Sequence, residues 1–209
     1  MRATALVLCL GGALSLAEGV AVPISAAAAQ HRLQRVFEQR RDAASLARPR
    51  VASNAPSVAP GRSPRTAART GVGGVATLPI GGPIARISVD RLGVRDIVLA
   101  GNGTHEQLAE GPTMIKQGDD ASPVTILAAH RDTHFLFIRD LREGDDVRLE
   151  FVNGVVERYR ITGFETVRWD RFSYPLHPAH PRLALTTCYP FGSTEYGGPL
   201  RRVAWAERR

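Results

Sequence analysis

Short apolar runs rich in β-branched residues recur from Leu78 to the end of the chain, and they constrain the fold more than any other feature. Runs of this length and composition, bounded by glycine, proline and polar residues, predict β-strands. Seven are expected, at Ile84–Val89, Asp96–Ala100, Val124–Ala129, Asp146–Phe151, Val155–Ile161, Leu183–Thr187 and Arg201–Ala206. Seven or eight short strands in about 130 residues predict a mainly all-β domain, either a closed barrel or a sandwich.

Three shorter features lie between the expected strands. Asn153-Gly154 separates two of them and predicts a β-hairpin with a type I′ turn. Thr104–Ala109 is expected to form a short helix capped by Thr104, because threonine accepts hydrogen bonds from free N–H groups at a helix start. Phe135–Leu141 is expected to form a helical turn. The domain should therefore carry only short helices.

The N-terminal part has a different composition. Residues 3–17 form an apolar run behind Arg2, and Glu18 interrupts the apolar sequence that continues to Ala29. Such a segment is either a cleaved signal peptide or a retained membrane anchor, and both would place the rest of the chain outside the cytoplasm. We therefore assign residues 1–29 to a signal peptide or membrane anchor.

Residues 30–76 are expected to join this segment to the folded domain. Leu33, Val36 and Phe37 have the spacing of one helical face, which predicts a short amphipathic helix beside the membrane. Residues 48–76 alternate proline, arginine, serine, alanine and glycine, a composition typical of a linker. The folded domain is then expected over residues 77–209.

The charge distribution argues against nucleic-acid binding. The chain has a net charge of +7, but residues 31–75 hold nine arginines against two acidic residues and account for all of this excess. Residues 76–209 hold seventeen basic and seventeen acidic side chains. A neutral globular part lacks the basic face that binding to a nucleic acid requires.

Two reactive side chains follow expected strands. Cys188 is the only cysteine of the expected domain, and Pro190 should end its strand just beyond the thiol. A lone cysteine in an exported protein is either an inert buried thiol or a nucleophile. His130 also follows an apolar strand. A thiol and an imidazole at two strand ends suit a nucleophile paired with a general acid.

The ordinary pKa values of the two groups leave this pair mostly in the wrong charge state. With values near 8.5 and 6.5, only about 1% of molecules would hold thiolate and imidazolium together at pH 7. A fixed positive charge near Cys188 would raise the thiolate share, and Arg201 or Arg202 could supply it. An arginine could also hydrogen-bond an oxyanion formed during attack on a carbonyl.

Taken together, these residues resemble the sortase family, and most closely the sortases of Gram-negative bacteria. The resemblance covers about residues 78–207. It rests on Leu185-Thr186-Thr187-Cys188, on Ala129-His130-Arg131-Asp132-Thr133-His134-Phe135 upstream, and on Arg201, with support from Ile84–Val94 and Glu110-Gly111-Pro112. The family usually has threonine four residues before the cysteine, where this chain has Ala184. We interpret that difference as a change in packing.

The resemblance implies an eight-stranded sortase barrel and a cysteine transpeptidase of the cell envelope. Such an enzyme would face the periplasm from the inner membrane, cleave an LPxTG-like C-terminal sorting signal of a secreted protein, and transfer it to an amine acceptor. Cys188 would be the nucleophile, His130 the proton donor and acceptor, and Arg201 the ligand of the substrate backbone or oxyanion. Thr187 and Arg131 are candidate substrate-binding residues, and no cofactor is expected.

Other interpretations start from the same residues. Arg202 is the alternative to Arg201 for the arginine of the site. Adjacent strand residues face opposite sides of a sheet, so only one of the two can point toward Cys188, and the spacing from Cys188 favours Arg201. Papain-like proteases place cysteine before histidine, and L,D-transpeptidases carry a Ser-His-Gly-Cys signature that this chain lacks. A non-catalytic envelope binding module and a different cysteine peptidase or hydrolase stay open. A metal site would draw on His130, Asp132, His134, Cys188, His177 and His180.

Overall fold

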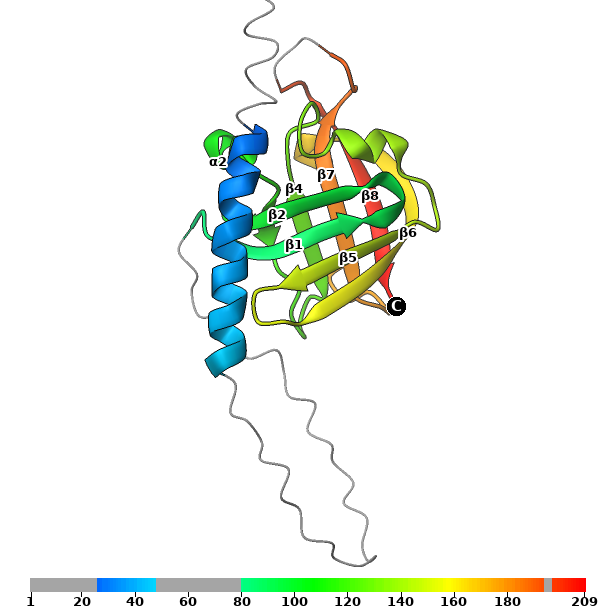
Figure 1. Cartoon of the computed structure of the whole chain (residues 1–209). Helices are drawn as coiled ribbons and strands as arrows, with labels where there is room; N and C mark the ends of the chain where they lie inside the picture. Colours follow the sequence, from blue (N-terminus) through cyan, green and yellow to red (C-terminus); the bar gives the residue numbers. More distant parts are fainter. Residues whose placement is uncertain (1–25, 48–79, 194–196) are drawn as a thin grey trace, which may run out of the picture.

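The computed structural model describes residues 26–47, 80–193 and 197–209 (Figure 1). Its eight strands close into a barrel in the order β1-β2-β3-β4-β7-β8-β6-β5. Their bounds are β1 Pro83–Val89, β2 Val94–Ala100, β3 Thr113–Lys116, β4 Val124–Ala128, β5 Asp146–Phe151, β6 Val156–Arg168, β7 Arg182–Tyr189 and β8 Leu200–Arg208. The mainly all-β barrel expected from the sequence is confirmed.

The helical elements are short, apart from a helix that covers residues 26–47. They are α2 (His105–Glu110) and the 3-10 turns η1 (Asp90–Leu92), η2 (Leu136–Asp140) and η3 (Trp169–Arg171). Thr104 caps α2 as expected, since its side chain accepts a hydrogen bond from the Gln107 N–H. The turn expected at Phe135–Leu141 is η2.

Two strands depart most from the sequence-based expectation, whereas the others differ from it by no more than two residues at either end. β3 was missed, because four residues between Pro112 and Gln117 are too few for a recognisable apolar alternation. β6 continues past Ile161 to Arg168 and pairs with β8 along its whole second half. Thr162 and Gly163 interrupt the apolar pattern there, and the structure places a register shift between Ile161 and Gly163. β6 therefore extends beyond its own apolar pattern because it pairs with the long strand β8.

The Asn153-Gly154 hairpin is present, but its turn is not the one expected. The Gly154 N–H donates to the Phe151 carbonyl oxygen over 2.8 Å, so Val152 and Asn153 are the central turn residues. Gly154 follows them with φ 80°, a left-handed conformation that glycine adopts without steric cost. The hairpin thus has a turn followed by a left-handed glycine, in place of a two-residue type I′ turn.

Both faces of β4 and β7 are buried. The barrel interior contains fully buried aliphatic side chains, among them Ile87, Leu127, Leu149, Leu183 and Leu185. A second cluster lies on the outer face of these strands. It contains Val124, Ile126, Ala184 and Val203, with Phe172, Tyr174 and Trp205 packed on it. Burial on both faces explains why these two strands appear in the sequence as continuous apolar runs.

β4 and β7 are parallel neighbours, and this pairing determines where the candidate site lies. Their register runs from Val124 opposite Arg182 to Ala128 opposite Thr186. The carboxyl ends of both strands therefore meet at one edge of the sheet. The residues that follow them, including His130 and Cys188, are brought to the same end of the barrel.

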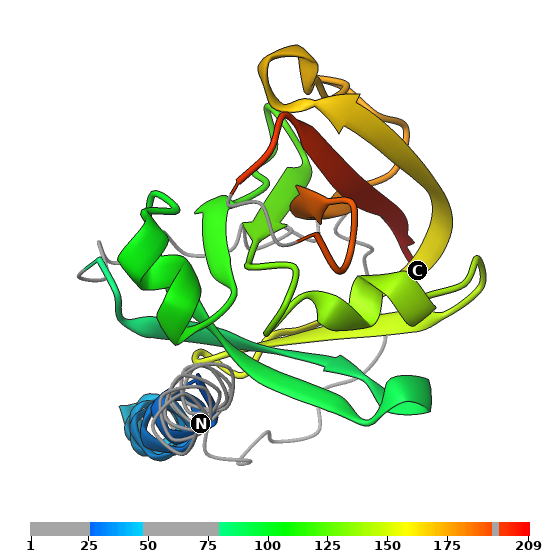
Figure 2. The same cartoon turned by 90° about the horizontal axis from the view of Figure 1, so that it is seen from above.

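The helix of residues 26–47 packs against the outside of the barrel (Figures 1 and 2). The side chain of Phe37, a residue of this helix, is fully buried, and the Arg86 guanidinium lies 4.8 Å from the centre of the Phe37 ring. The amphipathic helix expected from Leu33, Val36 and Phe37 lies within this helix, its place beside a membrane stays a prediction, and the expected boundary after residue 29 falls inside the helix. Within the described residues, no helix is long and apolar enough to cross a membrane.

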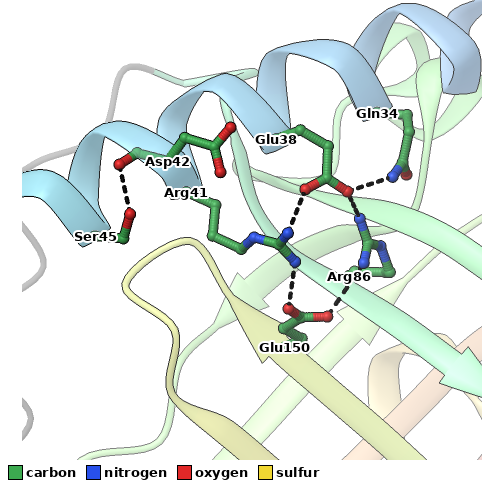
Figure 3. A network of polar contacts seen from close by, with 7 residues as sticks. All are labelled: Gln34, Glu38, Arg41, Asp42, Ser45, Arg86 and Glu150. Carbon is green, nitrogen blue, oxygen red and sulfur yellow. Dashed lines mark hydrogen bonds and ion pairs between the residues drawn. The ribbon is translucent and has the colours of Figure 1, made fainter.

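An alternating charge network holds the helix on β1 and β5 (Figure 3). Arg86 on β1 binds both Glu38 of the helix and Glu150 of β5, and Arg41 binds the same two carboxylates from the helix side. The Arg86 side chain is only 14% exposed. Since each charge has two opposite neighbours, none of the four is left desolvated without a partner.

At the other end of the helix, Gln30 binds the backbone of two elements. Its side-chain oxygen accepts a hydrogen bond from the Ile97 N–H over 2.6 Å, and its amide nitrogen donates to the Ile97 and Glu110 carbonyl oxygens. The helix is thereby joined to β2 and to the last residue of α2. The expected signal or anchor segment up to residue 25 and the expected linker lie outside the described residues.

Candidate active site

Cys188 and Arg201 lie directly opposite each other on β7 and β8. Opposed residues of an antiparallel pair point to the same face, with Cβ atoms roughly 4.5–5.5 Å apart. Cys188 is partly exposed and forms no disulfide. The sequence places these two residues at a strand end and a strand start, and the register makes them neighbours.

His130 lies in the turn that follows β4, and a hydrogen bond connects this turn to β7. Thr187 donates a 2.7 Å hydrogen bond from its hydroxyl to the Ala129 carbonyl oxygen, one residue before the histidine. The Phe135 N–H donates to the His130 carbonyl oxygen over 3.0 Å and closes the turn. The Cys188 strand and the His130 turn are therefore joined by a hydrogen bond between the residues that directly precede Cys188 and His130.

All three residues line one pocket of about 680 Å³. The sheet side of the pocket is formed by Ala128, Thr186, Thr187, Cys188 and Arg201, and the histidine turn contributes Ala129 to Thr133. The segment around α2 forms another part of the lining, with Gly103, His105, Leu108 and Ala109. A pocket that contains a thiol, an imidazole and a guanidinium has the groups needed for nucleophilic attack, proton transfer and anion binding.

The surroundings of His130 favour its neutral form. Burial is the main cause of its lowered pKa, and the nearby His105 imidazole lowers the pKa further. The Asp132 carboxylate and the His105 backbone act in the opposite direction. Among the described residues, the His130 Nε2 atom is buried and has no hydrogen-bond partner.

The two adjacent arginines of β8 point to different places. The Arg201 Nη1 atom donates to the Gly198 and Leu200 carbonyl oxygens, both over 2.9 Å, and the side chain lines the pocket. Arg202 donates to the Thr166 hydroxyl over 3.2 Å, and its guanidinium lies 5.0 Å from the centre of the Phe164 ring. Arg201 is therefore the arginine beside Cys188, as the spacing indicated.

Thr187 and Arg131 were expected to contact substrate, and the structure places both in the pocket lining. Each is nevertheless buried, with 2% and 8% of its surface exposed. Thr187 binds Ala129, and the Arg131 Nη2 atom donates to the Ser193 carbonyl oxygen over 2.8 Å. Their visible contacts fix the histidine turn and the segment after β7.

The histidines proposed for a metal site are dispersed. The His134 side chain is 5% exposed and binds the Asp96 carboxylate through Nδ1 over 3.2 Å. His177 and His180 precede β7, at the opposite end of that strand from Cys188. Within residues 26–47, 80–193 and 197–209, no three histidine, cysteine or acidic side chains are grouped so that they could hold a metal ion.

His105 is the pocket residue that the sequence did not indicate. Its ring centroid lies 4.7 Å from that of His130, with an angle of 68° between the two planes. It is the first residue of α2, and 25 positions separate it from His130. No local pattern links the two residues, so only the closed barrel could reveal the contact.

Ala184 occupies the position where sortases usually have threonine. It is fully buried in the outer cluster between β4 and β8, surrounded by Val124, Ile126 and Val203. A hydroxyl there would need a hydrogen-bond partner, whereas alanine fits an apolar surrounding without one. The environment agrees with our interpretation of Ala184 as a packing change.

A model of the sortase domain matches residues 87–209, which is more than half of the chain and includes Cys188, His130 and Arg201. The chain belongs to the sortase family. Among curated proteins, no sequence matches this sortase. Solved structures that resemble it include sortases of the A and C classes, and those described below are under 25% identical, so they inform on the fold.

Three of these structures illustrate the likeness. Sortase A from Corynebacterium diphtheriae has a TM-score of 0.53 at 18% identity, and the match covers 61% of this sortase and 60% of that chain. Pilus-related sortase C of Group B Streptococcus has a TM-score of 0.53 at 23% identity, over 61% and 67% of the two chains. Clostridium perfringens sortase C, solved with the C-terminal cell wall sorting motif, has a TM-score of 0.55 at 18% identity, over 64% and 74%.

Proposed function

We propose that this sortase is a cysteine transpeptidase that cleaves an LPxTG-like C-terminal sorting signal of a secreted protein and transfers the cleaved protein to an amine acceptor. The observation that carries the proposal is the register pair of Cys188 and Arg201, which opens into the same pocket as His130. The Clostridium perfringens sortase C was solved with a C-terminal cell wall sorting motif, and this supports the substrate class.

The first half of the reaction forms a thioester. The Cys188 thiolate attacks the carbonyl carbon of the Thr–Gly bond, and the carbonyl becomes a tetrahedral oxyanion. His130 in its protonated form donates its proton to the leaving amine as the C–N bond breaks. The products are an acyl group on the Cys188 sulfur, a neutral His130 and the released C-terminal fragment.

The second half returns the enzyme to its starting state. An incoming amine attacks the thioester carbonyl, and neutral His130 takes the proton that the amine loses. The new amide leaves, and Cys188 is again a thiolate beside a protonated His130. The lowered pKa of His130 suits this half, in which the imidazole must accept a proton.

Arg201 is proposed to bind the oxyanion or the substrate backbone. Its Nη1 atom is held by two carbonyl oxygens, and a guanidinium has five N–H donors in a fixed plane. The register pair with Cys188 places Arg201 in the lining of the same pocket as the thiol.

The neighbouring arginines supply a matched pair of variants. We expect Arg201→Ala to lower kcat/KM for a sorting-signal peptide by roughly 10²–10³-fold, the usual effect of removing one oxyanion donor. Arg202→Ala should lower it by less than about threefold, because Arg202 packs on Phe164. Peptide cleavage assays on both variants measure the ranking, and the reverse order would move the role to Arg202.

The test of the function is intact-mass spectrometry of the full chain incubated with a panel of LPxTG-like peptides. An added acyl mass on wild type that is absent from Cys188→Ala would establish the thioester and identify the accepted motif. A reversed-sequence peptide serves as the control substrate. Absence of an adduct with every peptide would contradict the proposal.

The place of action is part of the proposal. We propose that residues 1–29 direct or anchor the sortase to the extracytoplasmic face of the inner membrane, on the strength of their apolar sequence. The secreted substrate and the amine acceptor would meet the enzyme there. Alkylation of Cys188 in intact cells by a membrane-impermeant maleimide tests this location.

A further inference from the structure

His105 occupies a position from which it can act on His130. It begins α2, faces solvent, and lines the pocket together with the thiol and Arg201. Its ring meets the His130 ring edge to face, with centroids 4.7 Å apart. The contact joins two separate elements, α2 and the turn after β4, so the position of α2 bears directly on the His130 ring.

We infer that His105 is a positioning residue for His130, which supports its ring by edge-to-face packing and opposes a second positive charge on the pair. This inference rests on the proposed transpeptidation, in which His130 must be protonated in one step and neutral in the next. Two imidazolium groups at this separation repel each other, so the pair holds one proton more readily than two.

The remaining charges around His130 come from several elements. On its own turn are Asp132, which favours the charged ring, and His134, which opposes it weakly and is paired with Asp96. Among the described residues, the other ionisable groups that line the pocket are Cys188 on β7, Arg131 and Arg201. His105 is the neighbour with the largest effect on the His130 charge after burial.

The helix of residues 26–47 helps to fix the position of α2, which begins with His105. Gln30 donates to the carbonyl oxygen of Glu110, the last residue of α2. Gln107 lies between the two ends of α2, and its side-chain oxygen accepts from the Asn102 and Gly103 N–H groups. α2 is therefore fixed at both ends, and the position of His105 at its first residue is defined.

Two variants separate the roles of His105 in the full chain. His105→Phe keeps a ring against His130 and removes the second charge, whereas His105→Ala removes both. The readout is the titration midpoint of the His130 ring Cε1–H signal by NMR, assigned with His130→Gln. In His105→Phe we expect this midpoint to rise by roughly half a pH unit or more. In the peptide assay, His105→Ala should lower kcat by about tenfold or more with little change in KM, and His105→Phe by less.

His177→Phe is the matched control, because His177 is exposed on the segment before β7 and should leave the His130 midpoint unchanged. An unchanged midpoint in His105→Phe would overturn the inference, even where wild type forms the thioester. Equal kcat losses in the Phe and Ala variants would overturn the ring-packing role. A wild type that forms no thioester would reject the proposed function separately, because the NMR titration needs no substrate.

Discussion

The Cys188→Ala variant is expected to lose transpeptidation by roughly 10⁴-fold or more, because Cys188 is the only thiol among the described residues that line the pocket and is the proposed site of the acyl intermediate. Stability should change by only about 1 kcal/mol or less, since Cys188 is partly exposed at the end of β7 and its backbone pairing stays intact. The measurement is steady-state peptide transfer, together with thermal unfolding of both proteins.

His130→Ala provides the second half of this experiment. It should also abolish transfer, but its Cys188 thiol should remain open to alkylation, because the histidine supplies a proton and not the nucleophile. Retained transfer in either variant would reject the mechanism. A large loss of stability in Cys188→Ala would instead identify the thiol as a core residue, which its partial exposure argues against.

The second large effect concerns the helix of residues 26–47. Phe37→Ala is expected to lower the free energy of unfolding by about 3–5 kcal/mol, as for other fully buried aromatic side chains. The loss has two parts: the buried ring itself, and the surface on which the Arg86 guanidinium rests. Urea unfolding of the full chain, followed by tryptophan fluorescence, measures it.

Val36 is the matched control, since it is the preceding residue of the same helix and is 38% exposed. Val36→Ala should change the free energy of unfolding by about 0.5 kcal/mol or less. Equal effects at both positions would mean that the helix does not pack on the barrel as described. A large effect at Phe37 alone would show that the helix is part of the folded unit.

Much of the barrel could be predicted from sequence, because its strands are long enough to show a pattern. β1 and β7 have apolar residues at most positions, β5 alternates polar and apolar residues, and turn-forming residues end them. Cys188, His130 and Arg201 could be found for the same reason: each stands at a strand end, and a resemblance to sortases joins them into one motif. Local sequence carried enough information for both.

What could not be predicted depends on contacts between distant residues. β3 is held in place by its neighbours β2 and β4, and its four residues contain no pattern of their own. The docking of the helix depends on Arg86 and Glu150, which are 48 and 112 positions away from Glu38. The contact between His105 and His130 likewise exists only once the barrel has closed. Such contacts between distant residues cannot be recognised from a single sequence.

The bond between Gln30 and Ile97 has a consequence for any shortened form of this sortase. The Gln30 amide donates to and accepts from the backbone of one strand residue, as a neighbouring strand would. A fragment that begins after residue 47 would leave these β2 backbone groups without that partner, and an uncovered strand edge is a template for pairing with another molecule. Such a fragment is therefore expected to aggregate more readily than the full chain, even though the barrel strands themselves are all retained.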